Sequence, residues 1–140
     1  MLYVDTSVLV ALCTHEAKTA DVLKWYQACT EGLVSAAWCV TEFASALGLK
    51  QRTGQLNEAQ AQAAWMQFER ICTNDLQLLA VDASAFHRAA ILTLNASAGL
   101  RAGDALHLAC ALEAKAQGMV TLDVLLAKNA KLHKILPIKV

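Results

Sequence analysis

The chain has 140 residues, of which 56% are hydrophobic and 17% charged, and its 12 basic residues balance 12 acidic ones. This length fits a single domain over residues 1–140 and buries enough surface to fold without disulfides or a structural metal. Zero net charge decides neither for nor against nucleic acid, and the lack of any run of about 18 apolar residues argues against a membrane span.

Short apolar runs separated by longer segments of helical spacing predict alternating strands and helices. In chain order the predicted elements are strand Leu2–Val4, helices 7–14 and 18–29, strand Leu33–Ser35, helices 38–51 and Leu56–Cys72, strand Leu76–Val81, helices Ala83–Asn95 and Ala105–Gln117, strand Met119–Leu122, helix Val124–Ala130 and strand Leu136–Val140. Asn57 is the expected cap of the long helix, with Trp65, Phe68 and Cys72 on its inner face.

Strands joined by helical connections of a dozen residues or more imply an α/β fold with a mainly parallel sheet covered on both faces. In such sheets the ligand site lies beyond the carboxyl ends of the strands. Asp5 directly follows the first predicted strand and Asp123 directly follows the fourth, so we expect both at one edge. Asp104 stands at the start of a predicted helix, and the sequence alone does not show at which edge of the sheet that helix begins.

Each of these aspartates has an ordinary structural explanation. Asp5, Asp104 and Asp123 all stand where a helix begins, and aspartate is a favoured N-cap. Asp82 also follows a strand and stands beside Ser84, so we interpret it as a cap and nothing more.

Glu42 is the most informative acid. On a helix it shares a stripe with Trp38, Ala46 and Leu49, which should face inward. Glutamates are seldom fully buried unless they are paired or bound to a metal. The alternative is a boundary residue whose carboxylate reaches solvent.

The histidines form no zinc-type cluster with the cysteines. His107 lies one helical turn after Asp104. We expect His107 to lie in the core or to support the site from behind, rather than to bind a metal itself. Carboxylates without such a cluster indicate a hard cation, Mg²⁺ or Mn²⁺. Motifs for dinucleotides, the P-loop and serine hydrolases are absent, so we expect no other cofactor.

Two compositional features bear on partners and compartment. The hydrophobic excess reflects either apolar surface reserved for a partner chain or alanine-rich helices. Trp65, Met66 and Phe68 make the long helix a candidate contact surface. Five cysteines, odd in number and without a C-x-x-C motif, favour a reducing cytoplasm, and the strand-like N-terminus predicts no signal peptide.

The four acids in order resemble the PIN-domain family and, more narrowly, the VapC ribonuclease toxins of prokaryotic toxin–antitoxin pairs. The matching segments are VDTSVLVAL around Asp5, VTEFASAL around Glu42, RAGDALHLACA around Asp104 and TLDVLLAKNAKLH around Asp123. The likeness runs nearly the full chain, and the first and third segments are the most specific.

The resemblance implies a three-layer PIN-like fold with a five-stranded parallel sheet of order 3-2-1-4-5 flanked by helices. It also implies a homodimer, an inhibitory antitoxin and endonucleolytic cleavage of RNA with the help of Mg²⁺ or Mn²⁺. On this reading Asp5, Asp104 and Glu42 hold the metal directly or through water, and Asp123 binds a second ion or orients the attacking water. Thr6, Ser7 and Thr121 then support the site by hydrogen bonding.

Two other functions stay open. A catalytically silent PIN-like module that binds RNA or protein is the non-enzymatic alternative, although such a chain has no need to keep all four acids. A phosphotransfer hydrolase with Asp5 as nucleophile typically carries a second aspartate two residues later, where this chain has Ser7.

Overall fold

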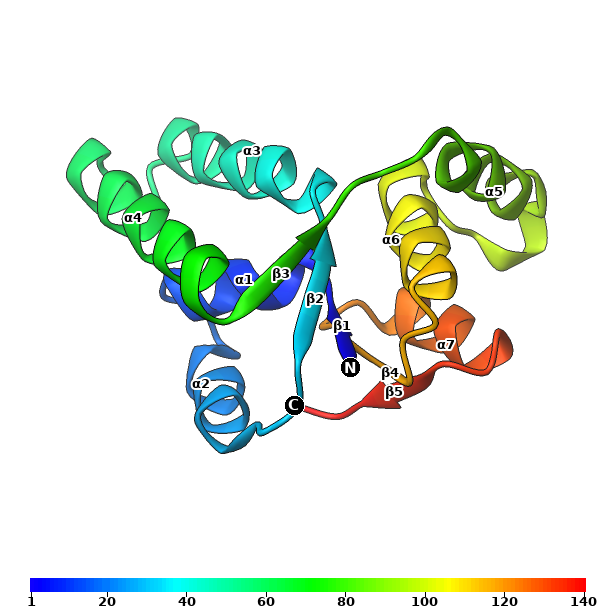
Figure 1. The fold of residues 1–140 in the computed structure, drawn as a ribbon. Helices are drawn as coiled ribbons and strands as arrows, with labels where there is room; N and C mark the ends of the chain where they lie inside the picture. Colours follow the sequence, from blue (N-terminus) through cyan, green and yellow to red (C-terminus); the bar gives the residue numbers. More distant parts are fainter.

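A computed structural model describes residues 1–140, with a parallel five-stranded sheet at its centre (Figure 1). The strands are β1 (Leu2–Val4), β2 (Leu33–Ala36), β3 (Leu76–Leu79), β4 (Gly118–Val120) and β5 (Leu136–Ile138). They are ordered β3-β2-β1-β4-β5, and every neighbouring pair is parallel. The predicted α/β class and strand order are therefore confirmed.

Helices cover both faces of this sheet, because each parallel connection must cross over it. On one side lie α1 (Thr6–Cys13), α2 (Thr19–Ala28), α3 (Trp38–Arg52) and α4 (Glu58–Asn74) (Figure 1). On the other side lie α5 (Ala83–Leu94), α6 (Ala102–Glu113) and α7 (Val124–Leu132), with a 3₁₀ turn at Ala96–Ala98.

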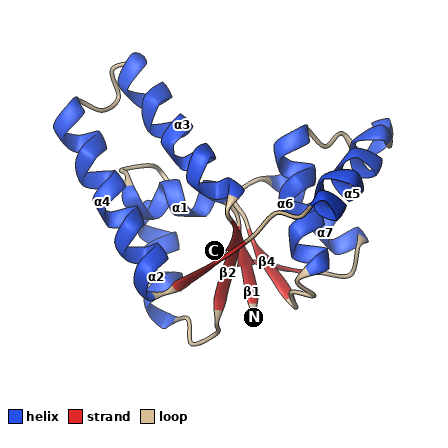
Figure 2. Cartoon of the chain, turned by 45° about the horizontal axis from the view of Figure 1, so that its top comes forward, coloured by secondary structure: helices blue, strands red, loops and turns tan.

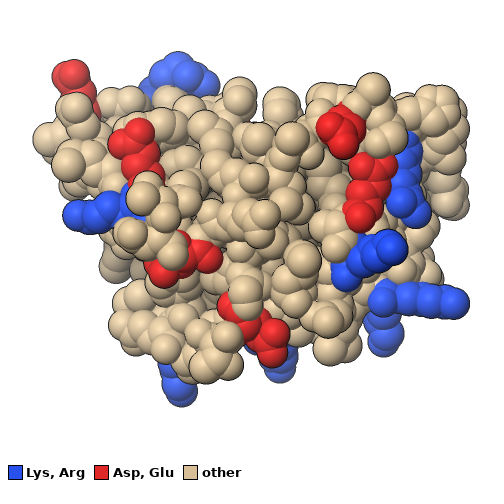
Figure 3. Space-filling view, in the orientation of Figure 1, with Lys and Arg blue, Asp and Glu red and all other residues tan.

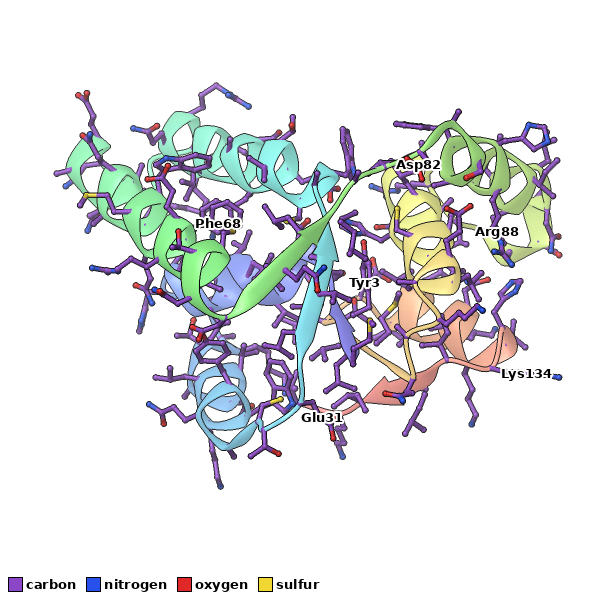
Figure 4. All side chains as sticks on the ribbon, viewed as in Figure 1. Tyr3, Glu31, Phe68, Asp82, Arg88 and Lys134 are labelled. Carbon is purple, nitrogen blue, oxygen red and sulfur yellow. The ribbon has the colours of Figure 1, made fainter.

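The alternation of side chains along β1 divides the core in two. Leu2 and Val4 belong to the cluster beneath α1–α4, whereas Tyr3 belongs to the cluster beneath α5–α7. Figure 4 shows Tyr3 and Phe68 on opposite sides of the sheet. Phe68 of α4 stacks on Phe43 of α3 with ring centroids 4.2 Å apart, which ties these two helices together.

The expected cap of α4 is confirmed. The Asn57 side chain accepts from the backbone N–H of Gln60 at 2.8 Å, and the Gln60 side chain accepts from the backbone N–H of Asn57 at 2.9 Å. This reciprocal pair satisfies two donors that the first turn of a helix leaves open. Phe68 is buried, and Trp65 and Cys72 pack partly buried against the same cluster, as predicted for the inner face.

Two predicted boundaries were wrong where the site is built. The helix expected at Ala105–Gln117 begins at Ala102, because the Ala105 N–H already bonds the carbonyl of Arg101 at 2.9 Å. The strand expected at Met119–Leu122 ends at Val120, because the Thr121 hydroxyl accepts from the Asp123 N–H at 3.0 Å and turns the chain toward α7. Asp123 therefore does not directly follow its strand.

The two groups of helices diverge above the carboxyl ends of the strands, as Figure 2 shows with this edge turned forward. On the face drawn in Figure 3, the centre carries no Lys, Arg, Asp or Glu side chain, and charged side chains lie to its left, to its right and below it. None of the helices combines the length and hydropathy that crossing a bilayer requires.

Candidate metal centre

Asp5 is fixed between two strands at the carboxyl edge of the sheet. Its backbone N–H donates to the Val120 carbonyl at 3.1 Å, and its side chain is only 4% exposed. Ser7 donates to Oδ1 at 2.6 Å, Thr121 donates to Oδ2 at 2.8 Å, and the Val8 N–H reaches Oδ1 at 3.4 Å. Asp5 thus caps α1 and also presents an oriented carboxylate to the edge.

The electrostatic setting of Asp5 is unfavourable to its charge. Burial raises the pKa of Asp5, and the hydrogen bonds from Ser7, Thr121 and Val8 and the charge of His107 offset that effect only in part. A buried carboxylate without a cationic partner is costly to ionise. A nearby cation would remove this cost.

Asp123 is linked to Asp5 through a single hydroxyl. Thr121 donates to Asp5 and accepts from the Asp123 N–H, while Ser7 accepts from the Leu122 N–H at 3.0 Å. The Asp123 side chain accepts from the Leu126 N–H at 2.8 Å and so caps α7. Capping uses one oxygen of Asp123 and leaves the other free for a ligand.

The stripe of α3 that carries Glu42 faces a groove, which corrects the expectation that it faces the core. The buried side chains of α3 are Cys39, Phe43 and Leu47. A groove of about 890 Å³ is instead lined by Trp38, Glu42, Ala46 and Leu49, and by Thr6, Ser7, Val10, Glu16, Thr41, Ser45, Arg101, Leu122 and Asp123. Helical periodicity identified the stripe correctly, but its face could be assigned only from the packing of α3 on α1 and α4.

Glu42 is nevertheless held at the edge of the sheet by two donors. The Thr6 hydroxyl donates to Oε1 at 2.7 Å, and His107 Nε2 contacts the same oxygen. Burial raises the pKa of Glu42, but the hydrogen bond and charge of His107, together with the hydrogen bond from Thr6, outweigh it, so that the pKa lies below its ordinary value. The surroundings of Glu42 therefore favour its ionised form, whereas those of Asp5 and Asp104 oppose theirs.

Asp104 lies in the first turn of α6 and does not cap it, because the N-cap is Arg101. The structure places this turn at the same edge as Asp5 and Asp123, which the sequence had left undecided. Burial raises the pKa of Asp104, and the charges of Asp123, Asp5 and Glu42 raise it further. The carboxylate of Asp104 therefore lies within electrostatic range of the other three predicted acids.

Sequence reasoning missed Gly103, which allows the start of α6 to approach α3. A β-carbon at this position would lie 3.1 Å from Glu42 Oε2 and 3.5 Å from Trp38 Nε1. The indole nitrogen is buried there without a hydrogen-bond partner. A glycine in the first turn of a helix, directly before a candidate ligand, was the available signal of this close approach.

The donor set fits a hard divalent cation, although the ligands are not already assembled around one. The four carboxylates lie at one edge of the sheet, and no lysine or arginine forms a salt bridge with any of them. Oxygen donors of this kind suit Mg²⁺ or Mn²⁺. No three acidic, histidine or cysteine side chains converge closely enough to hold an ion as they stand, so an ion bound here would need water molecules or small side-chain movements to complete its coordination. His15, His87 and His133 are exposed and bond none of the four acids.

Comparison with known protein families agrees with this fold. The PIN domain model matches residues 2–132. No curated protein matches the sequence.

Similar solved structures support the fold. Mycobacterium tuberculosis VapC20, a sarcin-ricin loop cleaving toxin, has a TM-score of 0.75 at 17% identity, covering 92% of this chain and 95% of its own. FitAcB from Neisseria gonorrhoeae has a TM-score of 0.74 at 17% identity, covering 99% and 97%. VapBC2 from Rickettsia felis, bound to a promoter DNA fragment, has a TM-score of 0.64 at 14% identity, covering 99% and 98%. With a family model that spans nearly the whole sequence, this chain belongs to the PIN domain family.

Proposed function

We propose that this PIN domain is a Mg²⁺- or Mn²⁺-dependent endoribonuclease and the toxin of a VapBC-type toxin–antitoxin pair. The observation that carries the proposal is the presence of four carboxylates at one edge of the sheet, where burial and the charges of Asp123, Asp5 and Glu42 raise the pKa of Asp104. A cation beside such a cluster offsets the cost of ionising its buried members. Solved relatives that are named as toxins or toxin–antitoxin complexes support the biological assignment.

In this proposal Asp5, Asp104 and Glu42 hold the ion, directly or through water. When bound, the ion supplies an acidified water and neutralises charge on phosphoryl oxygens. Ser7 and Thr121 keep both oxygens of Asp5 in fixed directions, and Thr6 does the same for Oε1 of Glu42. Asp123 holds a second ion or accepts a proton from the attacking water.

The groove beside the acids suits an extended polynucleotide strand. Its walls carry Glu42 and Asp123, together with the exposed cation Arg101 at the start of α6. Arg101 forms no salt bridge with these acids, so its guanidinium is free to contact a backbone phosphate. Hydrolysis would leave a 5′-phosphate and a 3′-hydroxyl, by analogy with the family.

The decisive test compares Asp5→Asn with Asp82→Asn. Both residues stand at the N-terminus of a helix that follows a strand, but Asp82 makes no side-chain capping bond and lies outside the pocket. Asparagine keeps the size of Asp5 and can still accept from Ser7. We expect Asp5→Asn to fold normally and to lose Mn²⁺-dependent RNA cleavage, while Asp82→Asn keeps it.

Each variant is purified identically and assayed on RNA with Mg²⁺, Mn²⁺ or a chelator, so that a contaminating nuclease affects all preparations equally. Undiminished cleavage by Asp5→Asn would refute the catalytic assignment. Mapping of new 5′-phosphate ends after induction of the wild type and of Asp5→Asn would identify the RNA.

One observation favours the alternative of a silent RNA- or protein-binding module: no three ligands are already assembled for an ion. Calorimetry separates the two functions, because the enzyme must take up Mg²⁺ or Mn²⁺ at least in the presence of RNA. Tight RNA or protein binding without metal uptake would establish the binding module.

The proposed partners are an antitoxin and a second copy of the chain, in a reducing cytoplasm where the five free cysteines stay reduced. Large apolar side chains are exposed on several helices, among them Met66 at 56%, Leu94 at 78% and Val124 at 85%. Light scattering at micromolar protein concentration measures the oligomeric state, and a molar mass equal to that of the monomer would contradict the proposed homodimer.

A further inference from the structure

A buried histidine with both ring nitrogens occupied lies directly behind the pocket. His107, on α6, is 2% exposed. Its Nδ1 lies 2.7 Å from the Tyr3 hydroxyl, and its Nε2 contacts Glu42 Oε1 and lies 3.2 Å from the Thr6 hydroxyl. The rings of Tyr3 and His107 meet edge to face, with centroids 5.7 Å apart. The imidazole is therefore held in one orientation.

The direction of these hydrogen bonds follows from the backbone of β2. The Ala36 N–H donates to the Tyr3 oxygen at 3.1 Å, so the Tyr3 hydroxyl proton is available for another acceptor. With a neutral ring, Tyr3 donates to Nδ1 and the ring hydrogen sits on Nε2. With a charged ring, both nitrogens carry hydrogen. In either state an N–H faces the Glu42 carboxylate, so His107 is a donor to Glu42 whatever its charge.

In this arrangement the two carboxylate oxygens of Glu42 have different neighbours. Oε1 accepts from Thr6 and His107, whereas Oε2 lies beside Gly103, one residue before Asp104. Glutamate has several rotatable bonds, and the Glu42 side chain is 27% exposed to the groove. A free Glu42 would be drawn into the groove by hydration, and the anchor at Oε1 opposes that movement.

We propose that His107, itself oriented by Tyr3, is the positioning residue that turns Glu42 Oε2 toward the pocket shared with Asp104. The chain of contacts runs from the backbone of β2 through Tyr3 of β1 and His107 of α6 to Glu42 of α3. It thereby joins the core beneath α5–α7 to the helices on the opposite side of the sheet. Its effect on RNA cleavage rests on the proposed function, whereas its effect on Glu42 does not.

The first test measures Mn²⁺ affinity without RNA, by the electron paramagnetic resonance of the free ion. Loss of a group that orients a ligand typically weakens metal binding about 10- to 100-fold, and we expect this for His107→Leu. His107→Gln, which keeps an N–H near the position of Nε2, should recover most of the affinity. Tyr3→Phe should give a smaller loss, and His87→Leu, on the exposed side of α5, should give none.

Thermal unfolding of each variant separates positioning from packing. If His107 only fills the core, then His107→Leu and His107→Gln change stability without changing Mn²⁺ affinity, which overturns the proposal. If His107→Leu does not fold, the Mn²⁺ affinities of His107→Gln and Tyr3→Phe test the proposal instead. Wild-type Mn²⁺ affinity in Tyr3→Phe, together with an unchanged NMR resonance of the His107 Nε2–H, would also overturn it.

The second test is a spectroscopic signature that needs neither metal nor RNA. The Nε2–H of His107 should give a slowly exchanging ring resonance in a ¹⁵N–¹H spectrum, and Glu42→Gln should shift it. An Nε2 without hydrogen, or a resonance indifferent to Glu42→Gln, overturns the proposal. If the wild type cleaves no RNA but both tests succeed, the nuclease function fails and the positioning role stands.

Discussion

Replacement of Gly103 by alanine should separate activity from stability. The added β-carbon would lie 3.1 Å from Glu42 Oε2, whereas ordinary contact begins at 3.4 Å, so the two must part by about 0.3 Å (3.4 − 3.1). Glu42 cannot retreat freely, because its other oxygen is bonded to Thr6 at 2.7 Å and to His107. The carboxylate therefore leaves its position, or the first turn of α6 shifts and carries Asp104 with it.

The size of the loss follows from this displacement. A misplacement of 1 Å in a catalytic constellation costs on the order of 100-fold, so a shift of about 0.3 Å costs roughly four-fold on a logarithmic scale. Stability should change little. Alanine is favoured over glycine in a helix by up to about 1 kcal/mol, but the tight contact with Glu42 offsets that gain, so Tm should stay within roughly 5 °C of the wild type.

The assay is Mn²⁺-dependent RNA cleavage, with thermal unfolding of the same preparations. Gly48→Ala is the matched control, because its β-carbon on α3 would meet only the Arg52 guanidinium, the mobile end of a long side chain, at 3.2 Å. We expect the control to gain stability and to keep full activity. Full activity in Gly103→Ala would show that the close approach of α6 to Glu42 has no functional role. A loss of activity no larger than the fraction of unfolded protein accounts for would lead to the same conclusion.

Two further predictions concern stability. Burial and the charges of Asp123 and Asp5 raise the pKa of Asp104, so its ionised form destabilises the folded state at neutral pH and that cost disappears as pH falls through the raised pKa. In chelator at pH 7, Asp104→Asn should therefore have a higher Tm than the wild type. This difference in Tm should become smaller at lower pH or when Mg²⁺ is added, and a difference that stays constant would contradict the prediction. Phe68→Ala removes a buried ring stacked on Phe43 and should cost about 3–5 kcal/mol in denaturant unfolding, and a cost below about 1 kcal/mol would refute its place in the core.

The sequence alone predicted the features that depend on neighbours along the chain. Alternating apolar runs and helical segments specified a parallel sheet, and the Asn57 cap was correctly placed. Asp5 and Asp123 were assigned to one edge because strand direction and the position of a residue after its strand are local properties. The resemblance, and not the spacing, supplied the strand order that the structure confirms.

Local patterns could not predict which side of α3 faces the core. Periodicity grouped Glu42 with Trp38 and Leu49, but Cys39 and Phe43 are the residues that pack inward. A stripe on a helix is defined by its own spacing, whereas its environment depends on the helices that pack against it. The same limit applies to the close approach of α6 to α3, where a β-carbon on Gly103 would lie 3.1 Å from Glu42 Oε2.

The tertiary structure alone determined how the acids are held. Thr121 and Asp5 are 116 positions apart and Tyr3 and His107 are 104 apart, yet each pair is joined by a hydrogen bond. Contacts of this kind leave no periodic trace in a sequence, because they form only when strands and helices from distant segments pack. The sequence therefore specified the carboxylates and the sheet that carries them, while packing across the sheet set their surroundings, their charges and the orientation of Glu42.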